Sequence, residues 1–197
     1  MNRTAIFAAV ALLTGAVVSH GNASAQVVAD SACPKHAVDI ASFATCDGER
    51  VAGRDVRLIS ARAAFDLKQT HGTDVLLVDV RSAAQVEADG TAADVSAVLP
   101  YPPQGGAAAD LQFVALVDVL VAMHGGNEHT TLVMLCADGS LAMRAAASLA
   151  EAGYRQLAVV EGGVDGVATA STKAGWKAAQ LPWTRHIDAR RLYPYAG

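Results

Sequence analysis

Three short apolar segments, separated by segments with helical periodicity, constrain the fold of this chain more than any other feature. They span residues 75–80, 131–135 and 157–160. A strand that is apolar at nearly every position is typical of a sheet covered on both faces. Strands that alternate with helices over short connections build parallel sheets. The sequence therefore predicts an α/β fold, a parallel sheet with helices on both faces.

Capping residues and apolar spacing delimit the expected helices. Ser60 can cap a first helix, and Asp110 is the candidate N-cap of a second, whose apolar residues recur at helical spacing. A third helix begins a few residues after the second apolar segment and stops at Gly153. Residues 95–99 are a further short strand candidate. Residues 26–57 have no sustained period, so we expect an irregular N-terminal extension there.

The first residues indicate export. Arg3 precedes an apolar run from Ala5 to Val18, and Ala23-Ser24-Ala25 has the small-x-small pattern that a signal peptidase cuts. The run is shorter than the roughly 20 apolar residues that a transmembrane helix needs. We therefore expect a periplasmic or secreted protein; an uncut signal would leave it tethered. The expected parts are a signal peptide (1–25), an N-terminal extension (26–55), one domain (56–183) and a C-terminal tail (184–197).

Composition excludes some partners. The formal net charge is −4, and removal of residues 1–25, whose only charge is Arg3, makes it −5. A net negative chain has no general attraction to nucleic acid. No later segment is long and apolar enough to span a bilayer, so we expect no membrane span after signal cleavage.

Three cysteines divide into a near pair and a lone residue. Cys33 and Cys46 lie close together, and in an oxidising compartment such a pair indicates a disulfide that pins the extension. Cys33 and His36 could instead be half of a metal site, but no second pair lies at zinc-finger spacing. Cys136 is then the unpaired thiol.

Cys136 follows the second apolar segment directly and precedes a helix. A helix N-terminus presents unpaired amides that favour a thiolate and can hold an anion on the sulfur. Gly139 lets the loop curl so that several amides face one atom. This geometry suits a nucleophile. The alternative is a small buried cysteine that only closes an apolar strand.

Several motifs together resemble rhodanese-like sulfurtransferases, over roughly Val56 to Trp183. The matching segments, in order, are Asp79-Val80-Arg81 after an apolar strand, Cys136-x-x-Gly139-x-x-Ala142 as the active-site loop, Gly153-Tyr154 before the closing strand and Gly162-Gly163, and Trp176 followed by Leu181-Pro182.

The resemblance implies a mechanism and its residues. Cys136 would take a sulfane sulfur from a small donor, hold it as a persulfide and pass it to an acceptor such as a protein thiol, without a cofactor or metal. Asp79 and Arg81 would organise the loop from the neighbouring strand end. The backbone cradle for the sulfur would come from Ala137, Asp138, Gly139, Ser140, Leu141 and Ala142.

The chain also departs from the family pattern. Many single-domain members carry an arginine at the position of Leu141, and thiosulfate-using relatives place basic residues where Ala137 and Asp138 stand. A carboxylate beside the cysteine disfavours an anionic donor, so we do not expect thiosulfate to be a good substrate. Phosphatase-like relatives need an arginine at the position of Ala142. Arg144 lies two residues further on, where a surface or salt-bridged arginine is the favoured interpretation.

Other hypotheses remain open. The chain is similar to exported rhodanese-like proteins linked to quinoprotein alcohol oxidation, although their second loop cysteine and tryptophan are missing here. One alternative is therefore a non-catalytic module that binds an exported protein partner in such an oxidation system. Another is a redox role, in which Cys136 forms a disulfide with a partner thiol.

Two weaker patterns have simpler structural interpretations. His124, Glu128 and His129 could offer ligands to a surface metal, but a solvated turn is favoured. The tail from Trp183 to Tyr195 mixes arginines and aromatic residues, as interfaces do, although a tail that packs on its own domain is favoured.

Overall fold

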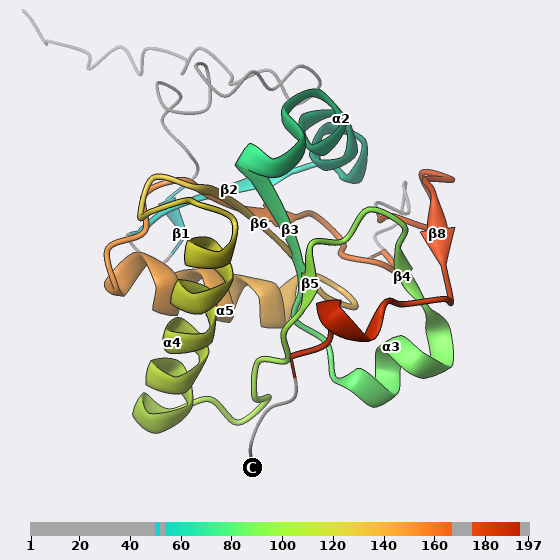
Figure 1. Ribbon diagram of the computed structural model, residues 1–197. Helices are drawn as coiled ribbons and strands as arrows, with labels where there is room; N and C mark the ends of the chain where they lie inside the picture. The colour runs from blue at the N-terminus through green and yellow to red at the C-terminus, as the bar shows by residue number, and fades with distance from the viewer. Residues whose placement is uncertain (1–49, 52–53, 167–174, 194–197) are drawn as a thin grey trace, which may run out of the picture. The chain divides into compact units, whose positions relative to one another are not determined.

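A parallel sheet forms the centre of the domain. The computed structural model describes residues 50–51, 54–166 and 175–193, so the predicted signal peptide and the Cys33–Cys46 disulfide lie outside the described residues. The strand order is β1-β2-β7-β6-β3-β5, and all strands are parallel except β1, which pairs antiparallel with β2 (Figure 1). The strands are β1 (Arg50–Val51), β2 (Arg54–Ile59), β3 (Val75–Asp79), β5 (Ala97–Val98), β6 (Thr131–Leu135) and β7 (Leu157–Val160). This arrangement confirms the predicted α/β fold.

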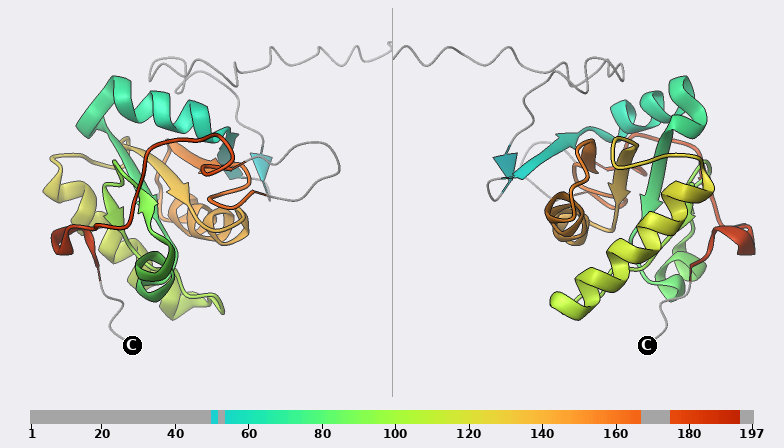
Figure 2. Two further views of the ribbon diagram at one scale, coloured as in Figure 1. Left: turned by 90° about the vertical axis from the view of Figure 1, so that its right-hand side faces the viewer. Right: turned by 60° about the vertical axis from the view of Figure 1, so that its left-hand side comes forward.

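Helices cover both faces of the sheet, as predicted. On one face α4 and α5 enclose a core that includes Phe113 and Leu149, and on the other α2 and α3 enclose a core that includes Leu67 and Trp176 (Figure 2). The helices are α2 (Ala61–His71), α3 (Ala83–Asp89), α4 (Ala107–Met123) and α5 (Ser140–Glu151), with 3-10 turns η1 (Gly72–Asp74) and η2 (Ala189–Arg191). Strands β3, β6 and β7 are buried throughout because both of their faces are covered.

Local capping explains where the helices begin. The Ser60 hydroxyl accepts a hydrogen bond from the amide of Ala63 at 3.1 Å, which confirms Ser60 as the N-cap of α2. The prediction for Asp110 is wrong, because α4 begins four residues earlier, with Gly106 rather than Asp110 at its N-cap. The Asp110 carboxylate instead accepts hydrogen bonds from side chains outside its helix, Tyr101 and Ser148. A tertiary contact therefore uses the side chain that the local pattern assigned to capping.

Strand β2 is an element that the sequence pattern did not predict. It pairs in parallel with β7, with Val56 opposite Leu157 and Ile59 opposite Val160. Among the described residues, only the two-residue β1 lies beyond it in the sheet, and Arg57 is half-buried. A strand near the edge of a sheet need not be apolar at every position, which is why its periodicity is weak.

The tail packs on the domain over its described residues, up to residue 193, as the favoured interpretation of the tail predicted. Strand β8 (Trp183–Thr184) pairs antiparallel with β4 (Thr91–Ala92). Further on, the amide of Tyr193 donates to the carbonyl of Val98 at 2.9 Å, and η2 lies beside β5 (Figure 1). Among the described residues, no helix has the length and apolar character needed to cross a membrane.

Candidate active site

Cys136 lies at the carboxyl edge of the sheet, directly after β6. Its side chain is buried, with 1% of its surface exposed. The register pairs Leu135, the last residue of β6, with Asp79, the last residue of β3, so both strands end at the same edge. The carboxyl ends of parallel strands are where open α/β sheets form their sites.

The loop after β6 directs backbone amides at the cysteine sulfur. The amides of Gly139 and Ala142 donate to Sγ of Cys136 at 3.2 and 3.3 Å. Gly139 is the N-cap of α5 and has φ +97°, a conformation that side-chain-bearing residues rarely adopt. The amide of Ser140 takes a different partner, the Asp138 carboxylate, at 2.9 Å. Two N–H groups can therefore stabilise negative charge on this sulfur or on an atom bonded to it.

The turn after β7 anchors the backbone of this loop. The amide of Val164 donates to the carbonyl of Cys136 at 2.8 Å, and that of Asp165 donates to the carbonyl of Ala137 at 2.9 Å. Gly163 lies so close that a Cβ built on it would be 2.3 Å from the Cys136 carbonyl oxygen. The second glycine after β7, Gly163, thus has a steric reason, which is the approach of one backbone to another.

Asp79 and Arg81 form a buried ion pair beside the site. Nη2 of Arg81 lies 2.6 Å from Oδ2 of Asp79 and donates to the carbonyl of Gly90 at 2.7 Å. The hydroxyl of Thr91 donates to the same carboxylate at 2.7 Å. Burial disfavours the charged guanidinium, but Asp79 and Asp89 outweigh it and raise the pKa of Arg81. These contacts connect β3 to the end of α3, and the hydrogen bonds to the cysteine-loop backbone come from the turn after β7 instead.

A pocket of about 310 Å³ opens at the cysteine. Arg81 is the member of the buried ion pair that reaches it. Ala137, Asp138, Ser140 and Leu141 of the predicted cradle also line it. Three lining residues were not among the predicted site residues: Gln85 from α3, Pro103 from the loop before α4, and Arg144 from α5.

Arg144 is an exposed arginine, as the favoured interpretation of the sequence predicted, and it also lines the cysteine pocket. Its guanidinium donates to the carbonyl of Pro103. Helical spacing could have revealed this position, because residues three and four apart share one face and Arg144 follows Leu141 and Ser140 by those intervals. The partner loop could not be found in this way, because Pro103 approaches only through the tertiary fold.

Asp138 is a charged residue close to the sulfur, with Oδ1 4.0 Å from Sγ of Cys136. The hydroxyl and the amide of Ser140 bind this carboxylate and hold the pKa of Asp138 below its usual value of 3.8. The side chain is therefore ionised at neutral pH.

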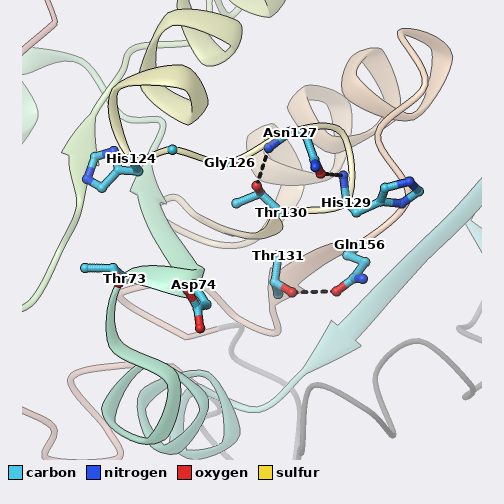
Figure 3. A pocket seen from close by; sticks show the side chains of 10 residues that line it. Thr73, Asp74, His124, Gly126, Asn127, His129, Thr130, Thr131 and Gln156 are labelled. Carbon is cyan, nitrogen blue, oxygen red and sulfur yellow. Dashed lines mark hydrogen bonds between the residues drawn. The ribbon is translucent and has the colours of Figure 1, made fainter.

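The histidines considered as metal ligands lie at the opposite edge of the sheet. A pocket of about 320 Å³ there is lined by His124 and His129 among other residues, and Figure 3 shows the two imidazole rings directed away from each other. Nδ1 of His124 lies 2.8 Å from the carbonyl of Leu120. In the part of the chain that the structure describes, no group of three or more His, Cys, Asp or Glu side chains is arranged to hold a metal ion.

Comparison with known proteins identifies a family. The chain matches the family model of the rhodanese-like domain over residues 63–170, which include β3, β6, β7 and the Cys136 loop. A comparison with curated proteins found no match.

Three of the solved structures with some likeness to this chain are the following bacterial proteins. A protein from M. tuberculosis is 22% identical, with 66% of this chain and 97% of that chain covered and a TM-score of 0.45. A protein of unknown function from Rhodopseudomonas palustris, titled a possible tyrosine phosphatase, is 18% identical, with 75% and 95% covered and a TM-score of 0.44. The homodimeric polysulfide-sulfur transferase of Wolinella succinogenes is 22% identical, with 64% and 77% covered and a TM-score of 0.41. Likeness of this degree carries no argument about chemistry.

Proposed function

The chain belongs to the rhodanese-like domain family, and from this premise we propose that it carries sulfane sulfur as a persulfide on Cys136 and transfers it to an acceptor thiol. The observation that carries the proposal is the geometry at Sγ of Cys136. This sulfur accepts hydrogen bonds from the backbone amides of Gly139 and Ala142, at 3.2 and 3.3 Å. A thiolate and a persulfide both carry negative charge, and oriented amides stabilise such charge without reorganisation.

The proposed reaction has two displacement steps. In the first, the Cys136 thiolate attacks the outer sulfur of a donor; an Sγ–S bond forms, and the donor's S–S bond breaks with its electron pair on the leaving sulfur. In the second, an acceptor thiolate attacks the outer sulfur of the Cys136 persulfide, and the Cys136 thiolate leaves. No net oxidation occurs, so neither step needs a redox cofactor.

The size of the pocket supports a small donor. Its volume of about 310 Å³ lies at the lower end of the usual range for small-molecule sites, and Cys136 forms part of its wall. Sγ is otherwise enclosed, which limits contact of a bound persulfide with bulk solvent.

The proposal places this reaction outside the cytoplasm. Residues 1–25 have the pattern of a cleaved export signal. The assignment to the branch linked to quinoprotein alcohol oxidation stays a prediction. Fractionation of cells that express the full chain tests the location, and recovery of uncut chain in the cytoplasm would contradict it.

Intact-mass measurement tests the persulfide directly. The full chain is treated with polysulfide, freed of excess reagent and measured without reductant. We expect a mass gain of one sulfur atom that Cys136→Ser lacks. Cys33 and Cys46 are present in both proteins, so their contribution cancels in this comparison.

The same experiment can overturn the proposal. Failure to load Cys136 with polysulfide, thiosulfate, mercaptopyruvate and an alkyl persulfide alike would exclude sulfur transfer and leave the non-catalytic binding module as the working hypothesis. Loading of both proteins to the same extent would also exclude it, because the sulfur would then be on another cysteine.

A further inference from the structure

The pocket at Cys136 has one positive charge that no carboxylate neutralises. Two arginines line the pocket, and one of them, Arg81, lies 2.6 Å from Asp79 and 3.2 Å from Asp89. For the other, Arg144, the described part of the chain places no carboxylate oxygen within 4.0 Å of the guanidinium. Arg144 therefore contributes an uncompensated charge to the pocket wall.

Uncharged contacts hold the Arg144 guanidinium in place. It donates through Nη1 to the Pro103 carbonyl, and its central carbon lies 5.7 Å from the centroid of the Tyr101 ring. Gly105 leaves the necessary space, because a Cβ there would be 2.1 Å from Nη2. Tyr101 is itself 4% exposed and bonded to Asp110. The arginine is positioned without loss of its charge, and a positioned guanidinium loses less entropy when it binds an anion.

Besides the paired Arg81, two side chains of opposite charge line the pocket. Asp138 contributes a carboxylate 4.0 Å from the sulfur, and Arg144 contributes the positive charge. An elongated donor with an anionic far end would be attracted to Arg144 and repelled by Asp138. This arrangement selects both the class of donor and its orientation.

We propose that Arg144 binds the carboxylate of a small organic persulfide, R–S–SH, while its outer sulfur lies at Cys136. This inference rests on the proposed function and names its donor class. The pocket volume of about 310 Å³ lies at the small end of the range for small-molecule sites, which suits a donor of this size. The Cys136 thiolate attacks the outer sulfur, and R–S⁻ leaves with the electron pair of the broken S–S bond. The products are Cys136–S–SH and the thiolate.

Alkylation of Cys136 tests the anion subsite independently of sulfur transfer. Iodoacetate and iodoacetamide react by the same displacement of iodide and differ in charge, and peptide mass spectrometry resolves the rate at Cys136. We expect Arg144→Gln to lower the iodoacetate-to-iodoacetamide rate ratio by about fivefold, the size of one exposed charge pair. Arg144→Lys should retain most of the ratio, and Arg155→Gln, which removes another exposed arginine, should leave it unchanged.

An unchanged ratio in Arg144→Gln would overturn the anion subsite. If both rates fell by the same factor while the ratio stayed unchanged, Arg144 would only support the Pro103 loop.

Persulfide donors with different far ends test the donor class. Three alkyl persulfides that end in a carboxylate, a hydroxyl or an ammonium group are supplied to the full chain. We expect the carboxylate donor to have the lowest KM, and Arg144→Gln to raise that KM about fivefold while the hydroxyl donor is unaffected. Equal changes for all three donors would overturn the donor class alone. Absence of loading from every donor in the unsubstituted chain would overturn the proposed function, while the alkylation ratio would still decide the anion subsite.

Discussion

At the residue scale, the charged groups near Cys136 differ in how far their charge is compensated. Asp79 and Arg81 form a buried ion pair, in which Arg81 also donates to the carbonyl of Gly90 and Asp79 also accepts from the hydroxyl of Thr91. Removing one partner of such a pair leaves an uncompensated buried charge, so we assign it a structural role. Asp138 is exposed, stays ionised and lies near the sulfur. It is therefore the carboxylate that an anionic donor meets first.

Asp138→Asn should accelerate loading of Cys136 by dianionic donors. The asparagine oxygen can still accept the hydrogen bonds of Ser140, so the loop is retained while the repulsion is removed. We expect the thiosulfate and polysulfide loading rates to rise about threefold, since an exposed charge contributes well under about 1 kcal/mol to such a step. The measurement is the initial rate of persulfide formation by intact mass. Asp66→Asn, on an exposed face of α2, is the control, and an unchanged rate in Asp138→Asn would contradict the role assigned to this carboxylate.

At the scale of elements, the site depends on two turns that follow neighbouring strands. The turn after β7 donates amides to the carbonyls of Cys136 and Ala137, and the loop after β6 in turn directs its amides at the sulfur. The geometry at Sγ is therefore a product of both turns. A side chain added between the two turns should disturb the hydrogen bonds to the Cys136 sulfur and also lower the stability of the domain.

Gly163→Ala should destabilise the domain strongly. Its φ is +57°, and the added Cβ would meet backbone atoms of Cys136 and Ala137 that cannot move aside as a side-chain end could. We expect a loss of about 3 kcal/mol in the free energy of unfolding, measured with urea, together with slower persulfide formation. The matched control is Gly125→Ala, with φ +71° and open space around the Cβ, which should cost about 1 kcal/mol from backbone strain alone. Equal losses in the two variants would refute the close approach.

At the scale of the whole domain, a charge network connects segments that are distant in the sequence. Asp89 at the end of α3 binds Arg81 after β3, and both of its carboxylate oxygens accept hydrogen bonds from Lys177 at 2.7 Å. Lys177 also binds Asp165, in the turn after β7, at 2.9 Å. The network thus connects the ends of two strands to the C-terminal part of the domain.

This network predicts a pH dependence of stability. The hydrogen bond from Lys177, with further help from Arg81, holds the pKa of Asp89 below its usual value of 3.8. A carboxyl group with a lowered pKa in the folded state stabilises that state above its unfolded pKa and loses this contribution as the pH falls through the folded value. We expect stability to decline below about pH 4, and to decline less steeply in Asp89→Asn. Urea unfolding at a series of pH values measures the slope. Lys177→Met should reduce this slope of stability against pH to a similar extent. An unchanged slope in Asp89→Asn would exclude the Asp89 carboxylate as its cause.

Elements with strong local signals were predictable from the sequence. The strands at 131–135 and 157–160 have the predicted bounds, because a continuous apolar run and the turns beside it specify a covered strand locally. Strand β2 and the start of α4 were not predicted correctly. Strand β2 lies near the sheet edge and has only a weak apolar period. Helix α4 begins after a glycine N-cap, and the Asp110 carboxylate accepts a hydrogen bond from Tyr101 instead of capping the helix.

The sequence by itself determined the class of fold and the position of Cys136 between a buried strand and a helix, because apolar periodicity and a glycine loop act over a few neighbouring residues. Only the tertiary structure decided what surrounds the sulfur. Pro103, Arg144 and the turn after β7 come from separate parts of the chain and meet because parallel strands end at one edge. The charges that a donor meets in the pocket come from side chains of these separate segments, so they cannot be predicted from the residues next to Cys136 alone.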